Sequence, residues 1–316
     1  MKNFAMTGVG GFVAPRHLKA INDTGNRLVA AVDPHDAVGI LDKYGFDVRF
    51  FTEIERFDRH LEKLKRGAEA ERVHFVSICS PNYLHDAHIR LALRSGANAI
   101  CEKPLVINPW NLDALQELEQ ETGRRVYTVL QLRLHPQLIA LRNKLRAAPS
   151  TLHDVCLTYC TSRGRWYDVS WKGSEERSGG IVTNIGIHLF DLLLWLFGPV
   201  TGSEVHLRDE HRIGGFLELE RARVRWFLST DVADLPFVPE PGVRTTFRSI
   251  TVDGEEVEFS DGFVDLHTRV YEEVLAGRGF GIDDGRGAIA LTHRIRQTAA
   301  AAPASPVHPM LEGRVR

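Results

Sequence analysis

The first 130 residues alternate short apolar runs with segments that have the period of a helix. Continuous apolar runs of this length predict buried strands, and apolar residues three and four positions apart predict helices. Because buried strands that alternate with helices form parallel sheets covered on both faces, residues 1–128 are predicted to form a doubly wound α/β domain. The predicted strands are Phe4–Val9, Leu28–Val32, Val73–Cys79, Ala97–Cys101 and Arg125–Gln131, and the predicted helices are Ala14–Asn22, Glu53–Arg66, Leu84–Arg94 and Leu112–Glu121.

The second half of the chain changes to the two-residue alternation of half-buried strands. Asp253-Gly254 between two such segments is a strong hairpin signal. Residues 129–316 are therefore predicted to form an α+β domain with a large, mostly antiparallel sheet, ending in a loose Pro-rich tail from Pro303. The predicted strands are Val155–Ser162, Phe216–Glu220, Val224–Leu228, Arg248–Val252 and Val257–Phe259, and the predicted helices are Val264–Leu275 and Ala288–Ala302.

Composition excludes several classes of protein. With 39 basic and 41 acidic residues in 316, the net charge of −2 does not favour a nucleic acid or an anionic membrane as partner. The four cysteines, with no C-x-x-C pair and no zinc spacing, predict reduced thiols and no metal site. The N-terminal apolar run is too short for a signal peptide, and no apolar stretch approaches the length of a membrane span, so we expect a cytoplasmic protein.

The first candidate site is a glycine-rich turn between the first predicted strand and helix. Glycines let a backbone approach a pyrophosphate closely, and a helix N-terminus favours its negative charge. The turn departs from G-x-G-x-x-G, because Val13 stands at the third glycine position and Ala14 is the next small residue. The candidate cofactor-binding residues here are Gly8, Gly10, Gly11, Phe12 and Val13.

Asp33 ends the second predicted strand, 25 residues after Gly8. A carboxylate at this place can accept hydrogen bonds from the adenosine ribose hydroxyls, and it repels a 2′-phosphate. This favours NAD over NADP as the cofactor. The alternative is that Asp33 only caps a helix.

Polar residues also follow the later strands of the first domain, where doubly wound folds bind their ligands. Lys103 can hydrogen-bond a substrate hydroxyl, and its pKa should fall beside an oxidised nicotinamide, which suits proton transfer. The alternatives are a proline turn that caps a helix at 80–85 and an ordinary surface lysine at 103. The candidate residues are Ser80, Asn82, His85, Glu102, Lys103 and Gln131.

Two segments of the second half add further candidates. Asn184 and His188 are four residues apart in a predicted buried helix and share one face, where polar groups need partners or a function. The alternative is a structural histidine with satisfied hydrogen bonds. A loop rich in cations and aromatic rings, with Arg163, Arg165, Tyr167 and Lys172, suits an anionic ligand. A loop at an interface between subunits explains it equally well.

Taken in order, these motifs resemble the glucose-fructose oxidoreductase/inositol dehydrogenase/MocA family. They are the glycine turn, the acid after the second strand, Glu-Lys-Pro at 102–104 and Gly-Gly-x(7)-His-x-x-Asp at 179–191. Each motif is weak alone, whereas the ordered set is specific and covers the whole chain. The resemblance implies a Rossmann domain that binds NAD, an NAD-dependent dehydrogenase acting on CH–OH groups, and a homotetramer.

Four stretches are closer to one branch of the family, the UDP-N-acetyl-2-amino-2-deoxyglucuronate (UDP-GlcNAcA) dehydrogenases. They are residues 14–21, 80–85, 109–112 and 184–188. The resemblance implies oxidation of the sugar C3 hydroxyl to a 3-keto sugar nucleotide, for an aminotransferase to use next. In that branch the product leads to diacetamido-mannuronic acid of lipopolysaccharide O-antigen, and some members recycle NADH by reducing 2-oxoglutarate.

The resemblance also implies roles for individual residues. Lys103 resembles the family lysine that contacts the reacting hydroxyl, and His188 resembles the histidine that is the other acid–base candidate. Many relatives have aspartate where this chain has Asn184, and an amide cannot relay a proton. We favour His188 as the base, and the reverse assignment stays open. The cations of the loop at 163–172 are expected to bind the uronate carboxylate and the diphosphate of the UDP-sugar.

Two other functions stay open. Another sugar or inositol dehydrogenase of the same family would differ only in its substrate. A non-catalytic NAD-binding regulator is the alternative from a different class, because fold alone does not decide function. The presence of both Lys103 and His188 argues against such a regulator.

Overall fold

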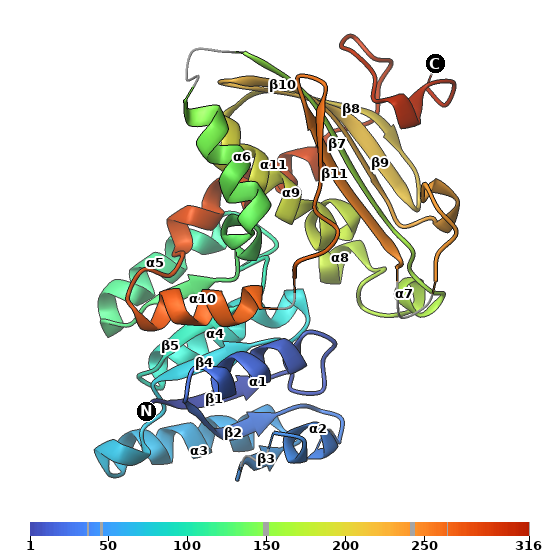
Figure 1. The fold of residues 1–316 in the computed structure, drawn as a ribbon. Helices are drawn as coiled ribbons and strands as arrows, with labels where there is room; N and C mark the ends of the chain where they lie inside the picture. Colours follow the sequence, from blue (N-terminus) through green and yellow to red (C-terminus); the bar gives the residue numbers. More distant parts are fainter. Residues whose placement is uncertain (37, 45–46, 148–151, 241–243, 264, 316) are drawn as a thin grey trace. The chain divides into compact units, whose positions relative to one another are not determined.

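The computed structural model describes residues 1–36, 38–44, 47–147, 152–240, 244–263 and 265–315 (Figure 1). The chain forms two compact units. The first comprises Met1–Gln131 and Val264–Arg286, and the second comprises Leu132–Phe263 and Gly287–Arg316. The predicted division placed every residue after 128 in the second domain, whereas the segment that ends at Arg286 packs with the first unit. Residue 264, where the helix Val264–Leu275 was predicted to begin, lies outside the described residues.

The first unit contains a six-stranded parallel sheet in the order β3-β2-β1-β4-β5-β6. This confirms the predicted doubly wound Rossmann sheet, because the chain runs outward from β1 in both directions. The strands are β1 (Asn3–Thr7), β2 (Arg27–Val32), β3 (Arg49–Phe51), β4 (Phe75–Ile78), β5 (Asn98–Cys101) and β6 (Val126–Thr128). All residues of β1 and β4 are buried, as their continuous apolar runs predict.

Helices follow the strands of the first unit in sequence. They are α1 (Ala14–Asp23), α2 (Val38–Asp42), α3 (Ile54–Arg66), α4 (His85–Arg94) and α5 (Asn111–Thr122). The sequence analysis missed α2 and β3, which have five and three residues and are too short to show a period. The late helix α10 (Leu266–Leu275) packs beside α1 and buries His267, Val270 and Tyr271.

The second unit contains a six-stranded mixed sheet in the order β12-β11-β7-β10-β9-β8. Only β7 and β10 pair in parallel, so the prediction of a mostly antiparallel sheet is confirmed. Asp253 and Gly254 have φ of 52° and 87° and form the predicted hairpin turn. The strands are β7 (His153–Thr161), β8 (Val200–Arg208), β9 (Arg212–Leu219), β10 (Ala222–Ser229), β11 (Thr246–Val252) and β12 (Glu255–Glu258).

The helices of this part of the chain include three longer ones, α6 (Pro136–Arg146), α9 (Ile187–Phe197) and α11 (Ile282–Gln297), and two short ones, α7 (Trp166–Val169) and α8 (Glu175–Ser178). The core of the second unit packs α9 against the sheet. The rings of Phe190 and Trp226 meet edge to face, with their centroids 5.2 Å apart. The predicted helix Ala288–Ala302 begins six residues earlier as α11, because glycines in its first turns hide its start. One of them, Gly287, lies where a Cβ would be 3.2 Å from Leu194.

The tail from Pro303 is not loose, which corrects the prediction. Leu311 is fully buried and packs with Cys160 and Phe227 of the sheet, and His308 is 1% exposed. Nε2 of His308 also lies 3.1 Å from Oγ1 of Thr158. Proline-rich composition suggested disorder, but the few apolar side chains of this segment suffice to anchor it.

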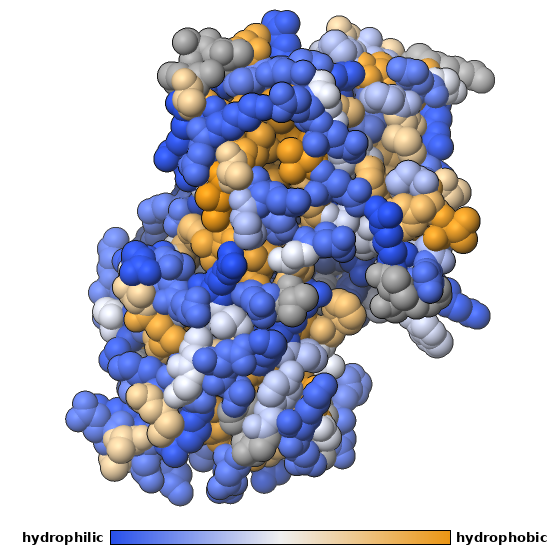
Figure 2. All heavy atoms as spheres, in the orientation of Figure 1, coloured by the Kyte–Doolittle hydropathy of each residue, from blue (hydrophilic) through white to orange (hydrophobic). Residues whose placement is uncertain are grey.

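One helical stretch, Glu175–Phe197, is long and apolar enough to cross a membrane by length and hydropathy, contrary to the sequence-based expectation. Within its apolar window, 67% of the residues are buried inside the protein. This is how a core helix of a folded domain behaves, and α9 indeed belongs to the core of the second unit. Figure 2 shows hydrophilic residues over most of the visible face.

Candidate active site

The glycine turn joins the ends of three strands of the first unit. Gly8 has φ of +74°, and its backbone N donates a hydrogen bond to Val32 O at 2.9 Å. A Cβ on Gly8 would lie 2.6 Å from both the carbonyl carbon of Cys79 and the backbone N of Ser80. Only glycine fits here, because both the backbone conformation and the close approach of β4 exclude a side chain.

The helix that follows this turn has an N-terminus suited to an anion. Helix α1 begins at Ala14 without a side-chain cap, has proline in its first turn, and carries no acid there. Ala14 N and Arg16 N already donate to Gly11 O and Val13 O, at 3.1 and 3.0 Å, so the helix dipole is what favours an anion at this end. Val13, which stands at the third glycine position of the motif, is the residue before α1. The turn and the start of the helix therefore form without a glycine at that position. Phe12 is 77% exposed.

Asp33 supports the glycine turn from the end of β2. Its Oδ2 accepts a hydrogen bond from Gly10 N at 2.9 Å, and its Oδ1 accepts one from His35 N at 3.0 Å. The bond to His35, two residues on, forms an Asx turn rather than a helix cap. Each carboxylate oxygen can accept a further hydrogen bond, so a ribose could bind here without breaking the turn.

Two loops at the ends of β4 and β5 are joined by a histidine. His85 is 1% exposed, and its Nδ1 and Nε2 lie 2.6 Å from Pro104 O and 2.8 Å from Ser80 O. Burial lowers the pKa of His85 more than these two carbonyls raise it, so the ring is neutral and donates to one carbonyl at a time. Since both nitrogens face backbone carbonyls, His85 holds the loops together, and its predicted contact to a cofactor stays a prediction. Asn82 is also buried, and Ser80 Oγ lies 2.8 Å from Nδ1 of His88.

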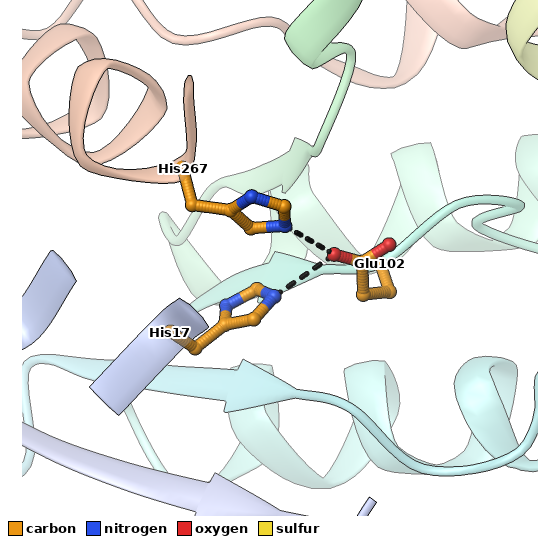
Figure 3. A group of neighbouring side chains, drawn as sticks. All are labelled: His17, Glu102 and His267. Atoms are coloured by element: carbon orange, nitrogen blue, oxygen red, sulfur yellow. Dashed lines mark hydrogen bonds and ion pairs between the residues drawn. The ribbon is translucent and has the colours of Figure 1, made fainter. Parts of the chain in front are cut away.

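Glu102, which follows β5, accepts hydrogen bonds from two histidines (Figure 3). Nε2 of His17 and Nε2 of His267 each lie 2.9 Å from its Oε1. Burial alone would raise the pKa of Glu102, but the hydrogen bonds from His17 and His267 outweigh it and hold the pKa well below its usual range. The carboxylate is therefore ionised although it is buried. Lys103 is the next residue along the chain.

Two buried oxygens near the strand ends have no hydrogen-bond partner within the described part of the chain. They are Thr7 Oγ1, at the end of β1, and Gln131 Oε1, after β6. Because unpartnered buried polar atoms are costly, such atoms indicate a ligand or water. Together with the glycine turn, the uncapped helix and Asp33, they fit a dinucleotide such as NAD.

In the second unit, Asn184 and His188 lie on an irregular helix. Residues Val182–Gly186 form a π-helical turn that continues into α9, and such turns are often found at functional sites. Asn184 and His188 are half-buried, while every other residue between positions 182 and 190 is buried. The two side chains therefore share the accessible face of this helix, as the sequence predicted.

A hydrogen bond joins the cationic loop at 163–172 to the helix face that carries Asn184. Asn184 Nδ2 donates a hydrogen bond to Tyr167 Oη at 3.0 Å, and burial raises the pKa of Tyr167. The Arg163 guanidinium lies over the Tyr167 ring at 5.7 Å. Burial, and secondarily Arg163, lowers the pKa of Lys172. Arg163 and Arg165 are exposed, so the loop offers cations to an anionic ligand.

Several residues of these sites escaped the sequence analysis. Arg133 donates two hydrogen bonds, of 2.7 and 3.0 Å, to Asp191 of α9, the helix that also carries His188. His17, His267 and Tyr271 join the network around Glu102. A histidine inside an apolar helix face, as at position 17, is the one local signal that could have found them.

The chain matches two parts of a known oxidoreductase family. Residues 2–130 match its NAD-binding Rossmann fold, and residues 153–233 match its C-terminal alpha/beta domain. Together these segments cover more than half of the chain. The chain belongs to the GFO/IDH/MocA oxidoreductase family. This confirms the family, the two-part fold and NAD as the cofactor.

The family contains a similar protein of known structure, the WlbA (WbpB) dehydrogenase of Thermus thermophilus. It is 53% identical to this chain, and the match covers 98% of this chain and 100% of the other. The TM-score is 0.93 for its complex with NAD and alpha-ketoglutarate, and 0.92 for its complex with NAD and UDP-GlcNAcA.

More distant relatives catalyse different reactions. The 2,7-anhydro-N-acetylneuraminate hydratase of Mediterraneibacter gnavus is 28% identical over 66% of this chain and 54% of its own length. The inositol 2-dehydrogenase of Rhizobium meliloti is 28% identical over 66% of this chain and 59% of its own length. The chain thus spans little more than half the length of these curated relatives, and family membership alone leaves the substrate open.

Proposed function

We propose that this protein is an NAD-dependent dehydrogenase that oxidises the C3 hydroxyl of UDP-GlcNAcA to a 3-keto sugar nucleotide. The observation that carries the proposal is the 53% identity, over almost the whole chain, to the Thermus dehydrogenase whose structure holds NAD and UDP-GlcNAcA. Each unit supports the proposal by itself, because the first carries a dinucleotide-type turn and Lys103, and the second carries His188 and the cationic loop.

The first unit supplies the cofactor residues of the proposal. The glycine turn lets the pyrophosphate approach the positive end of the α1 dipole, and Asp33 accepts hydrogen bonds from the adenosine ribose. Thr7 and Gln131, whose side-chain oxygens lack partners among the described residues, complete the polar lining. When bound, NAD accepts the hydride that leaves C3.

The remaining residues orient the sugar and move its proton. Lys103 donates a hydrogen bond to the C3 hydroxyl and polarises it, and His188 accepts the hydroxyl proton. Asn184, held by Tyr167, orients the sugar rather than relaying a proton. Arg163, Arg165 and Lys172 bind the carboxylate and the diphosphate, since guanidinium and ammonium groups suit both.

The wider setting of the reaction follows from the same resemblance. We propose that 2-oxoglutarate reoxidises NADH, because the Thermus relative was crystallised with NAD and alpha-ketoglutarate. A homotetramer and a role in lipopolysaccharide O-antigen synthesis are parts of the proposal that rest on the resemblance alone. A cytoplasmic location, expected from the apolar pattern of the sequence, is also part of the proposal.

The test is a comparison of substrates by the absorbance of NADH at saturating NAD. We expect kcat/KM for UDP-GlcNAcA to exceed that for UDP-GlcNAc, which lacks the carboxylate, by at least about 100-fold, because charged hydrogen bonds contribute about 1.5–3 kcal/mol each. If the protein oxidises myo-inositol or a free sugar and does not oxidise UDP-GlcNAcA, the proposal is wrong. The protein is then another sugar or inositol dehydrogenase of the same family.

A further inference from the structure

Glu102 is enclosed by groups from distant segments of the first unit. His17 belongs to α1 and His267 to α10, and their imidazoles approach one carboxylate oxygen of Glu102 (Figure 3). The three residues are 0%, 3% and 6% exposed, in the order His17, His267 and Glu102. A buried carboxylate is stable only when hydrogen bonds replace its water. Here two imidazoles do so.

The hydrogen bonds continue from this cluster to the sheet. An ionised carboxylate only accepts, so Nε2 donates in both rings, and Nδ1 of a neutral ring is an acceptor. Nδ1 of His17 lies 2.8 Å from Tyr271 Oη, which lies 2.6 Å from Ser77 Oγ of β4. Tyr271 then donates to His17 and accepts from Ser77. The network thus connects α10, α1, β4 and the end of β5.

Opposing effects of burial and hydrogen bonding set the charges of His17 and Glu102. Burial lowers the pKa of His17 more than its bond to Glu102 raises it, so this ring is neutral at pH 7. Glu102 carries the negative charge. No part of the proposed reaction uses His17, His267 or Tyr271, although all three are buried. The two histidines bond to Glu102, the residue before Lys103, and Tyr271 bonds to His17.

We propose that His17 and His267 are positioning residues for Lys103: they hold the Glu102 carboxylate, and with it the turn that carries Lys103, in one orientation. On the other side of Lys103, the carbonyl of Pro104 is bonded to His85 at 2.6 Å. Both neighbours of the lysine are therefore fixed by buried imidazoles. The proposal rests on the proposed function, in which Lys103 contacts the reacting hydroxyl.

The same atoms would also suit a cation. One ligand atom each of His17, Glu102 and His267 lies within 4.8 Å of the others, and two imidazoles with a carboxylate are a common zinc set. Hydrogen bonds account for the observed contacts, because both 2.9 Å distances are ordinary N–H···O lengths. Metal analysis of the purified protein belongs in the test, and a tightly held, stoichiometric metal ion would overturn the positioning role.

The main experiment compares His267→Leu with His267→Gln. The Gln amide can donate from the place of Nε2, and Nδ1 of His267 has no partner among the described residues, so one donor suffices. We expect His267→Leu to lower kcat for UDP-GlcNAcA about 10- to 100-fold, the effect of a small misplacement. The dissociation constant of NAD should change by less than about threefold, and His267→Gln should restore most of kcat.

A second readout needs no activity. In the ligand-free protein, trace acetic anhydride labels lysines, and mass spectrometry gives the labelling of Lys103 relative to the exposed Lys43. We expect the ratio to change in His267→Leu and to return in His267→Gln. Equal loss of kcat in both variants, or a ratio that neither variant changes, would overturn the proposal.

Two controls keep the outcome decisive. Tyr271→Phe keeps the ring against Phe4, with ring centroids 5.7 Å apart, and removes only the hydroxyl, which binds His17 and Ser77. It should change both readouts in the same direction as His267→Leu, by less, and it serves if the Leu variant does not fold. If the wild-type protein does not oxidise UDP-GlcNAcA, the proposed function fails, while the labelling ratio still decides whether the histidines position Lys103.

Discussion

Asn184 and His188 are the residues on which the proposed chemistry depends most. Both lie on the accessible face of a helix whose other residues there are buried, and Asn184 is bonded to Tyr167. An amide holds a position without exchanging a proton at neutral pH, whereas an imidazole changes its protonation between pH 5 and 8. His188 is therefore the group of this pair that can accept the hydroxyl proton.

The assignment of the base can be tested with His188→Asn and Lys103→Met. Because a general base contributes about 100- to 10,000-fold, we expect His188→Asn to lower kcat by that factor and to remove the acidic limb of the kcat–pH profile. Lys103→Met should lower kcat less and keep that limb. The control is His211→Asn, which removes an imidazole between β8 and β9 and should behave as wild type. Near-normal turnover of His188→Asn would show that the assignment is wrong.

Local sequence was sufficient for some site residues and insufficient for others. Gly8 and Asp33 stand at the two strand ends of one strand–helix–strand unit, so spacing was enough to make them candidates. Glu102 and His267 are 165 residues apart, and only the fold brings them together. The same holds for Arg133 and Asp191, at a separation of 58 residues. No periodicity can indicate such pairs.

Two elements at the candidate site depart from regular geometry at the residues predicted to bind ligands. The turn after β1 needs a positive φ at Gly8, and the helix before α9 widens into a π-turn around Asn184. The sequence predicted the turn, because glycines mark it, and it predicted the helix as well. It could not predict the π-turn, because the pattern of apolar residues is nearly the same for both helical forms.

The glycine turn can be tested with Gly8→Ala and Gly25→Ala. Both glycines have a positive φ, +74° and +68°, but a Cβ on Gly25 meets no atom within 4 Å. Gly25→Ala should therefore lower the free energy of unfolding by about 1–2 kcal/mol through backbone strain alone. Gly8→Ala adds a clash with the backbone of Cys79 and Ser80, so it should cost more and abolish NAD binding. Equal stability and equal NAD affinity in the two variants, measured by denaturation and fluorescence titration, would contradict this account of the turn.

At the scale of the whole molecule, the chain departs from a simple division into two halves. The segment with α10 returns to the first unit and brings His267 to Glu102 at the end of β5 and Tyr271 to Ser77 of β4. The last residues cover part of the second unit's sheet through Leu311 and His308. Alternation of strands with helices predicted the first sheet, and two-residue alternation predicted the second, but neither pattern carries information on where late segments pack.

The C-terminal segment should make stability depend on pH. Burial, and secondarily Arg225, lowers the pKa of His308 from 6.5 to about 4. Between these values the unfolded chain binds a proton that the folded chain does not, so the free energy of unfolding falls as the pH falls, by at most about 1.4 kcal/mol per pH unit from this group. His308→Asn, which keeps an acceptor for Met310 N, should reduce the slope between pH 6.5 and 4 in urea denaturation. If the variant and the wild type have the same slope of unfolding free energy against pH, the pKa of His308 does not differ between the folded and unfolded chain, and this account is wrong.

The central claim is hydride removal from C3 of UDP-GlcNAcA, and the most direct measurement follows that hydrogen. The protein is incubated with UDP-GlcNAcA deuterated at C3, catalytic NAD and 2-oxoglutarate, and the products are analysed by mass spectrometry. We expect a 3-keto sugar nucleotide that has lost the deuterium, together with 2-hydroxyglutarate that has gained it. A sugar nucleotide that is oxidised but keeps the deuterium, or one that is not oxidised at all, would contradict the claim.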